Sequence, residues 1–316
     1  MIPAKFDYVR PSSVDEAVRA LASGGDDAKA IAGGQSLMPL LRLRLAYPER
    51  LVDLGGLDSL RGVRDLGDAL EIGALTTHYE VVRDPLIRAH CGLLAQAAAT
   101  IADPAVRHRG TIGGGLAHAD PAGDLPAVIT ALDATLVAAG PSGSREIRPA
   151  DCFGDYLTSS LAPGEILTSI RVPKLDGWGY RYEKFNVTAQ AWAIVGVAAV
   201  ARRSNGHVAE ARVGLTNMGS VPIRAPRRRP PGWRPRPRAP TRGRTRRATC
   251  GPPRTTAGIS RESSPGGHWP RRRVPRNGMM AMIVGQKRRI APQLTHDHET
   301  AAWRPRSRRT PWRPVR

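Results

Sequence analysis

The kind of sequence changes abruptly near Ala225, and this change limits which part of the chain can build a hydrophobic core. Residues 1–225 carry 23 Lys and Arg against 24 Asp and Glu, and they contain apolar runs and turn signals. Residues 226–316 carry 25 basic and 3 acidic residues, and Pro and Arg recur there every two or three positions. Such a segment buries too little apolar surface to offset chain entropy. We therefore expect a globular region over 1–225 and a disordered Arg/Pro-rich tail over 226–316.

Three interpretations of this tail stay open. A GC-rich coding sequence translated out of frame produces Arg, Pro, Gly, Ala, Thr and Trp in this style, and we favour this interpretation. A solvated linker to a partner is the second. A nucleic-acid-binding arm is the third, because clustered Arg attracts phosphate. On the favoured interpretation no nucleic-acid partner is expected.

Several classes of protein are excluded by what the sequence does not contain. No stretch approaches the ~18–20 continuous apolar residues that a membrane helix needs, so we expect no membrane span. The first residues, MIPAKFDYVRPSS, have no apolar segment typical of a secretory signal, so a cytoplasmic location is expected. The only cysteines are Cys91, Cys152 and Cys250, which are too scattered for a disulfide framework or a CxxC metal site.

Three histidines could suggest a metal site, but their spacing argues against one. His78, His108 and His118 lack the helical HxxxH spacing of a zinc site. We interpret them as hydrogen-bonded structural residues or neighbours of a ligand. No metal-ligating residue is therefore predicted.

Alternation and periodicity predict an α+β fold. A strand and then a capped helix are expected over 3–22, and a short strand leads into the glycine turn at 33–34. Helix is expected over 79–99 with a break at Pro85, and again over about 124–132. Three consecutive strands follow Gly177, with a hairpin signal between the last two.

Two glycine-rich segments carry the functional information. The first is Ala32-Gly33-Gly34-Gln35-Ser36, and the second is Thr111-Ile112-Gly113-Gly114-Gly115. Without Cβ atoms, backbone can approach a ligand closely, and successive N–H groups can surround phosphate oxygens. Neither segment is a Rossmann or Walker motif, and each alone is more often a plain turn. Together they suit a ligand with two phosphates.

With their flanks, these segments resemble a known family. In order along the chain come IAGGQSLMPLLRLRL, VDLGGL, EIGALTTH, VRHRGTIGGGLAHADPAGDLP, LAPGEILTSIRVP and YEKF. This series resembles the FAD-binding medium subunit of molybdenum hydroxylases, a family that includes aerobic carbon monoxide dehydrogenase and xanthine dehydrogenase. The resemblance covers residues 1 to about 224.

The resemblance implies a two-subdomain FAD-binding fold of the PCMH type. Its N-terminal subdomain would span 1–55 and its middle subdomain 56–175, followed by a partial antiparallel-sheet domain over 177–225. Both glycine segments would hold the FAD pyrophosphate, Ile101 would lie near the flavin ring and Asp124 would reach polar groups of FAD. Leu167 would pack at the adenine end and Lys184 would sit near the isoalloxazine. No catalytic residue is expected on this chain.

In this family the medium subunit transfers electrons and does not transform the organic substrate. The resemblance implies an iron–sulfur small subunit that delivers electrons, a large subunit that holds the molybdenum cofactor, and an external acceptor. A heterotrimer or a dimer of heterotrimers is the expected assembly. A free-standing flavin oxidoreductase, a non-functional frameshifted copy and a basic nucleic-acid-binding protein remain alternatives. The substrate is not determined by the sequence.

The chain departs from the family pattern after Arg224. Family members continue with helices that complete the third domain, whereas Arg/Pro-rich sequence follows here. We therefore expect the sheet to lack cover on one face, with apolar residues such as Val195, Val197 and Val200, or their alternates, exposed. Poor order is expected from Gly177 onward.

Overall fold

Residues 2–225 are described by the structure, a computed structural model, and the predicted tail over 226–316 lies outside the described residues. A parallel three-stranded sheet begins the fold, in the order β1-β3-β2. Its strands are β1 (Asp7–Val9), β2 (Ala28–Ile31) and β3 (Arg50–Asp53), and its helices are α1 (Val14–Gly24) and α2 (Leu37–Arg42). Ser13 caps α1 by accepting from the Glu16 N–H, which confirms the predicted strand and capped helix.

A five-stranded antiparallel sheet forms the middle of the fold, in the order β4-β5-β10-β6-β7. Its strands are β4 (Val63–Asp65), β5 (Ala69–Gly73), β6 (Thr135–Gly140), β7 (Gly143–Ile147) and β10 (Ile166–Pro173). A two-stranded ribbon of β8 (Phe153–Asp155) and β9 (Thr158–Ser159) follows the short helix α9 (Pro149–Cys152).

The helices of the middle region lie between β5 and β6 in the chain. They are α3 (His78–Arg83), α4 (Pro85–His90), α5 (Gly92–Ala98), α6 (Pro104–Arg109), α7 (Ile112–His118) and α8 (Asp124–Leu132). The predicted break at Pro85 is confirmed, because Pro85 is the first residue of α4. The predicted helix over 124–132 is confirmed as well. Every residue of α8 is buried, as a helix that is apolar on all sides requires.

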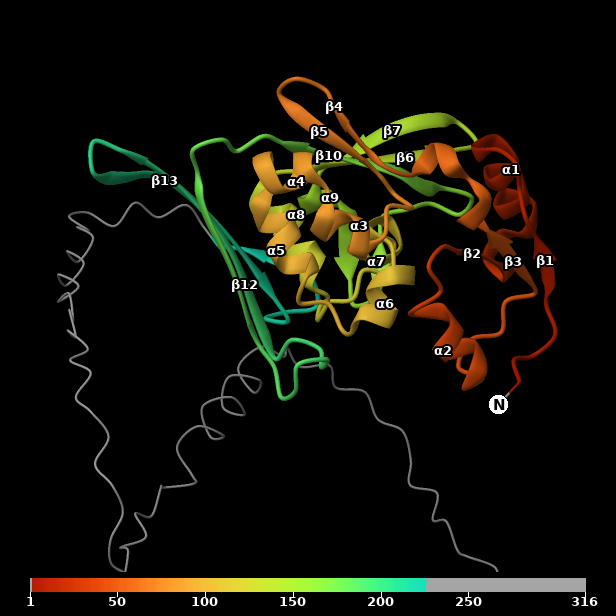
Figure 1. Cartoon of the computed structure of the whole chain (residues 1–316). Helices are drawn as coiled ribbons and strands as arrows, with labels where there is room; N and C mark the ends of the chain where they lie inside the picture. Colours follow the sequence, from red (N-terminus) through yellow and green to blue (C-terminus); the bar gives the residue numbers. More distant parts are fainter. Residues whose placement is uncertain (1, 226–316) are drawn as a thin grey trace, which may run out of the picture. The chain divides into compact units, whose positions relative to one another are not determined.

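The residues after Gly177 form an antiparallel sheet of four strands. They are β11 (Gly179–Phe185), β12 (Val195–Ser204), β13 (His207–Thr216) and β14 (Ile223–Arg224), in that order. Figure 1 shows α5 and α8 between this sheet and the middle sheet. The three larger sheets lie within 7–53, 63–173 and 179–224, so the predicted subdomain borders fall between sheets.

The expected lack of cover applies only to the face that carries Val195 and Val197, and the expected poor order from Gly177 onward differs from the structure, in which β11 to β14 are regular strands. Ala198 and Val200 are buried, because α5 and α8 of the middle region cover that side. Val195 and Val197 alternate with them and are only half-buried on the opposite side. The helices that precede the sheet in the chain therefore supply cover that the sequence pattern did not reveal.

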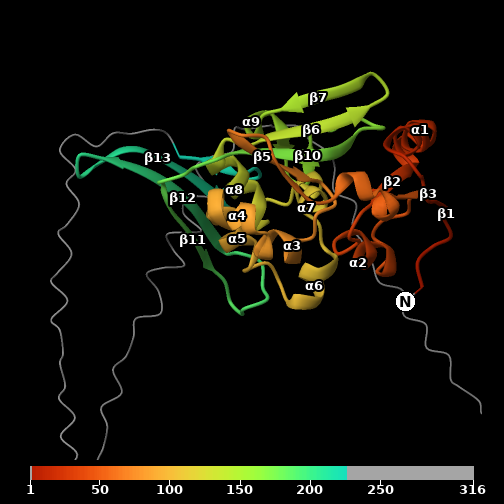
Figure 2. The same cartoon turned by 45° about the horizontal axis from the view of Figure 1, so that its top comes forward.

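Helix α8 lies against the C-terminal sheet (Figure 2), and side chains of the sheet pair with acidic groups at both ends of the helix. At its start, Asp124 accepts a hydrogen bond from the Tyr182 hydroxyl and pairs with Lys184. At its end, Asp133 forms ion pairs with Arg212 and Arg224. Between these ends the helix lies directly on β13, where a Cβ added at Gly214 would be 2.1 Å from the Ala127 carbonyl oxygen.

Candidate functional site

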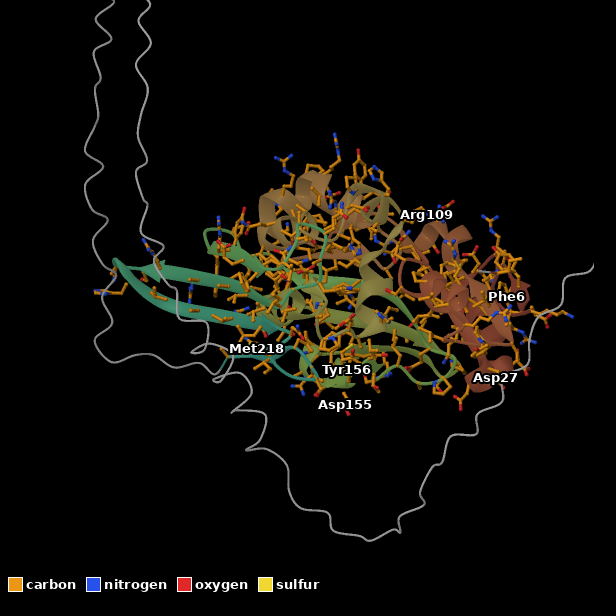
Figure 3. All side chains as sticks on the ribbon, turned by 90° about the horizontal axis from the view of Figure 1, so that it is seen from below. Phe6, Asp27, Arg109, Asp155, Tyr156 and Met218 are labelled. Carbon is orange, nitrogen blue, oxygen red and sulfur yellow. The ribbon has the colours of Figure 1, made fainter. Side chains whose placement is uncertain are left out.

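The two glycine segments predicted to act together lie side by side. A Cβ added at Gly114 would lie 3.6 Å from the Ala32 Cβ. A Cβ added at Gly33 would lie 2.1 Å from the Arg109 carbonyl oxygen, so only glycine permits this contact. Figure 3 shows Arg109 where the middle helices meet the N-terminal subdomain. The fold therefore joins segments that are far apart in the sequence at the boundary between the N-terminal sheet with its helices and the middle helices.

A cavity of about 540 Å³ lies along this boundary. The predicted site residues that line it are Ala32, Gly33, Gly34, Gln35, Ser36, Ile101, Thr111, Gly113, Gly114, Gly115, Asp124, Leu167 and Lys184. Ile112 differs from the others, because its side chain is fully buried in the core and does not line the cavity. Residues from all three predicted subdomains therefore meet at one hollow.

The first glycine segment presents backbone donors that have no protein partner. Within residues 2–225, no hydrogen bond is formed by the N–H groups of Gly33, Gly34, Gln35 and Ser36. Gly34 has φ +73°, a conformation that favours glycine and turns the chain toward α2. Successive unpaired N–H groups on a cavity wall are the donor set that phosphate oxygens require.

The second glycine segment differs from the predicted turn, because it is the start of helix α7. Its N–H groups already have protein partners: that of Ile112 donates to Thr76 O, that of Gly113 to Ala74 O, and that of Gly114 to the Thr111 hydroxyl. A Cβ on Gly113 would lie 2.5 Å from the Ala74 Cβ, so glycine is needed here for packing. The segment thus supplies a backbone wall and the Thr111 hydroxyl, whereas the unpaired N–H groups belong to the first segment.

Asp124 and Lys184 form a buried ion pair on the cavity wall. Lys184 Nζ lies 2.9 Å from Asp124 Oδ2, and both side chains are 6% exposed. Lys184 also donates to the Thr100 carbonyl oxygen, next to Ile101. Burial raises the pKa of the Asp124 carboxyl, although the hydrogen bond from Tyr182 and the Lys184 charge oppose that shift. Burial and the nearby Asp124 charge raise the pKa of Tyr182, which keeps its hydroxyl a donor.

Several cavity residues were not predicted from the sequence. They include Lys29, Glu165, Gln190 and Trp192, whereas His78 and His118, which were interpreted as structural residues or neighbours of a ligand, line the cavity as well. His78 is the first residue of α3, inside the capping box of Thr77 and Glu80, and this local pattern does not decide whether it faces a ligand. The segment at Gln190–Trp192 joins β11 to β12, and no motif marks it. Only the folding of the C-terminal sheet onto the middle region brings it to the cavity.

The residues present fit a dinucleotide cofactor such as FAD. The cavity lies within the range of about 300–1,000 Å³ typical of cofactor sites. One wall carries four unpaired N–H groups, as a pyrophosphate requires, and the same hollow continues past Ile101 and Leu167, which offer apolar contact to ring systems. A buried cation, Lys184, faces the same hollow.

Comparison with known proteins identifies the family. Residues 4–175 match the family model described as the FAD binding domain in molybdopterin dehydrogenase. The chain belongs to this family. It is thus an FAD-binding medium subunit of the molybdenum hydroxylase type and part of an oxidoreductase.

Named relatives agree with this family. The carbon monoxide dehydrogenase medium chain of Hydrogenophaga pseudoflava is 44% identical over 227 residues, which cover 71% of this chain and 78% of the relative. The glyceraldehyde dehydrogenase medium chain of Sulfolobus acidocaldarius is 36% identical over 225 residues, covering 71% and 80%. The solved carbon monoxide dehydrogenase from Hydrogenophaga pseudoflava matches with a TM-score of 0.70 at 43% identity, over 71% of this chain and 78% of that one.

Two further observations concern only the described residues. No helix over residues 2–225 has the length and apolar character needed to cross a membrane. The same residues include no group of three or more His, Cys, Asp and Glu side chains arranged to hold a metal ion.

Proposed function

We propose that this chain is the electron-transfer subunit of a three-subunit molybdenum hydroxylase. In this proposal FAD receives electrons from iron–sulfur clusters of a small subunit and passes them to an external acceptor, while a large subunit oxidises the substrate at molybdenum. The observation that carries the proposal is the single cavity in which both glycine segments, Asp124 and Lys184 meet. Relatives named as medium chains or subunits of dehydrogenases support it.

The roles of the cavity residues follow from their chemistry. The N–H groups of Gly33 to Ser36 hold the pyrophosphate, and the Thr111 hydroxyl adds a donor from the opposite side. Ile101 and Leu167 provide apolar contact at the two ends, as predicted from the resemblance. Ile112 acts only through its backbone, since its side chain lies in the core. Bound FAD supplies the capacity to exchange electrons singly or in pairs.

The protein contributes binding and electrostatics around this cofactor. Lys184 and Asp124 place a positive and a negative group in a site with little water, where charges interact strongly. The buried Tyr182 hydroxyl and the Thr100 carbonyl fix the orientation of the pair. We propose that Lys184 is the group that favours negative charge on the neighbouring part of the cofactor.

The test is to purify the tagged full chain from its native cells and measure flavin, iron and molybdenum per chain. We expect FAD together with iron and molybdenum in one complex whose two other subunits co-purify. The mass of that complex distinguishes a heterotrimer from a dimer of heterotrimers. Cytoplasmic fractionation of the same cells tests the predicted location.

Other outcomes would contradict the proposal in different ways. FAD without iron, molybdenum or co-purifying subunits would identify a free-standing flavoprotein. A folded chain without flavin, even after FAD is added, would identify a non-functional copy of the family. Either result leaves the family membership in place and removes the electron-transfer role.

A further inference from the structure

The C-terminal sheet has an inner face covered by helices and an outer face that is turned away from them. Helix α8 packs on the inner face, where a Cβ added at Gly214 would lie 2.1 Å from the Ala127 carbonyl oxygen. Ala198 lies opposite Gly214 on the neighbouring strand and is fully buried on the same side. Because successive side chains of a strand alternate in direction, Val197 and Ala199 point to the outer face.

The outer face is more apolar than a sheet face in water usually is. An antiparallel sheet with one solvated face normally places polar residues on that side. Here Val197 lies between Glu183 on β11 and Leu215 on β13, and Leu215 pairs with Ile223 on β14. Phe185 is 67% exposed and Ile223 is 37% exposed. A contiguous exposed apolar face of this kind is typical of an interaction surface.

Large and small side chains are separated along this face. The half toward the end of β11 carries the large side chains of Phe185, Val195, Val197, Leu215 and Ile223. The half toward the start of β11 carries mostly small residues, namely Gly179, Ala199, Ala201 and Ala211, together with Val213. One half of the outer face is therefore raised and the other is low.

The charges of this face are divided in the same way. Glu183 lies in the raised half and Arg181 in the low half, and their side chains, 65% and 67% exposed, pair with each other. A two-fold axis that crosses the strands between these two residues would lay the raised half of one chain on the low half of another. The same axis would set Arg181 opposite Glu183 of the second copy. The outer face is thus complementary to itself in size and in charge, as a symmetric dimer interface requires.

The charge of the outer face favours a second copy over the chain's own tail. Arg181 and Glu183 balance each other, so the face has no excess of negative charge. Residues 226–316 carry 25 basic and 3 acidic residues, which such a face does not attract.

The area of the face suits a weak dimer. From Val195 to Ala201 it extends about 23 Å along β12, and its four strands, spaced by ~4.8 Å, give it a width of about 19 Å. Each chain would then cover roughly 400 Å², and protruding side chains increase the accessible area that is buried. Two chains together approach about 1,200 Å², the lower limit of specific interfaces.

We propose that the outer face of the C-terminal sheet binds the outer face of a second copy of this chain, related by a two-fold axis across the strands. This inference goes beyond the proposed function and does not require bound FAD. Lys184 lies on β11 between Glu183 and Phe185, and it faces Asp124 on the inner side. Dimerisation therefore uses the side of the sheet opposite to the one that lines the cavity.

Two sets of variants test charge and size separately. Arg181→Glu places acidic residues on both sides of the contact, and the double variant Arg181→Glu, Glu183→Arg restores opposite charges. Ala201→Phe adds bulk to the low half, where the second copy would rest. Arg148→Glu is the matched control, because Arg148 forms a similarly exposed ion pair on α9 in the middle region.

The experiment is sedimentation equilibrium of the full chain over a series of concentrations. We expect a reversible dimer at micromolar concentration, and association at least about tenfold weaker in Arg181→Glu, because like charges then face each other. The double variant should stay within about threefold of the native chain, and Arg148→Glu should be unchanged. Ala201→Phe should also associate about tenfold more weakly, since the added ring prevents close packing of the two faces. Thermal unfolding checks that each variant is folded.

Several results would overturn the inference. A native chain that is monomeric at every concentration would do so, as would larger aggregates without a discrete dimer. Stronger association of Ala201→Phe would indicate unspecific apolar contact in place of a fitted interface. A monomeric full chain whose residues 1–225 dimerise would assign the face to residues 226–316. A dimer that binds no FAD would remove the proposed function and leave this inference in place.

Discussion

At the scale of single residues, the cavity wall depends on charges and polar groups that the fold has taken out of water. Asp124 begins α8 and Lys184 lies on β11, and the two buried side chains form an ion pair. Removing one partner of a buried pair leaves an uncompensated charge, which costs far more than the pair itself contributes. The same pair lines the cavity, so under the proposed function its loss affects both stability and cofactor binding.

Replacing Lys184 with Met tests this link. The variant should lower the free energy of unfolding by about 3 kcal/mol or more, because Asp124 is left buried without its cation. It should also weaken FAD binding. Denaturant unfolding and flavin titration measure the two effects. The double variant Lys184→Met, Asp124→Asn should recover part of the lost stability; a single variant as stable as the native chain would contradict the importance of this pair.

His78 predicts a dependence of stability on pH. Because its pKa is lowered to about 4 in the folded chain, the unfolded chain binds a proton first as the pH falls below about 6.5. Stability from this group is therefore complete above pH 6.5 and is lost between about 6.5 and 4, by roughly 3 kcal/mol in all. As the pH falls from about 6.5 to 4, the free energy of unfolding of the cofactor-free chain should decrease more steeply in the native protein than in His78→Leu.

The comparison of these two proteins is the control for that prediction. The other titratable groups, including Asp124 with its raised pKa, are present in both proteins, so their contributions cancel in the difference. Equal slopes would show that His78 is protonated in the folded chain, contrary to its burial.

At the scale of elements, the C-terminal sheet and helix α8 form one packing unit. The sheet pairs with acidic groups at both ends of the helix, and β13 touches the helix backbone between them. The opposite side of the sheet carries half-buried apolar residues, including Val195, Val197 and Leu215. Contact with α8 therefore determines the position of β11, which carries Lys184, and of the segment Gln190–Trp192 between β11 and β12, both of which line the cavity.

Gly214→Ala tests this contact. Its Cβ would lie 2.1 Å from the Ala127 carbonyl oxygen, so the sheet and the helix must separate. We expect a loss of about 2–3 kcal/mol in unfolding free energy, with weaker FAD binding because Lys184 moves with the sheet. Gly179→Ala is the matched control, since its Cβ would lie 3.7 Å from the Ala201 carbonyl oxygen, an ordinary contact. Equal stability of the two variants would mean that the sheet does not rest on α8.

At the scale of the whole molecule, the cavity lies in residues 1–225, where the numbers of basic and acidic residues are nearly equal. Its lining residues lie between Lys29 and Trp192, and all come from the region before Ala225. The relatives that match this chain also match over about 225 of its residues. The remaining 91 residues hold nearly all of the excess positive charge.

Truncation to residues 1–225 tests whether the binding site is complete without the tail. We expect the same ratio of flavin absorbance to protein in the truncated and the full-length chains, because every lining residue is retained. Retention on a polyanion column should fall with truncation, since net charge drops from +21 to −1. Loss of flavin on truncation would show that residues 226–316 contribute to the site, against our prediction.

Local sequence was sufficient to predict features that depend on a single segment, such as helix boundaries and glycine turns. Pro85 divides two helices because it has no N–H and its φ suits a first helical turn, and the apolar run over 124–132 forms a buried helix. The two glycine segments were recognised because glycine is needed where backbone approaches backbone or a ligand. The family itself was also evident from these motifs in order.

Only the tertiary structure decided which glycine segment keeps unpaired N–H groups and which side chains reach the cavity. Helix α7 uses the N–H groups of its glycine segment internally, so most of the free donors lie at Gly33 to Ser36. Ile112 enters the core, and His78 and Trp192 reach the cavity, because packing orients side chains that local sequence leaves undetermined. The C-terminal sheet gains a covered face from helices earlier in the chain. The physical reason is that burial and pairing depend on residues distant in sequence, whereas turns and helix starts depend on their neighbours.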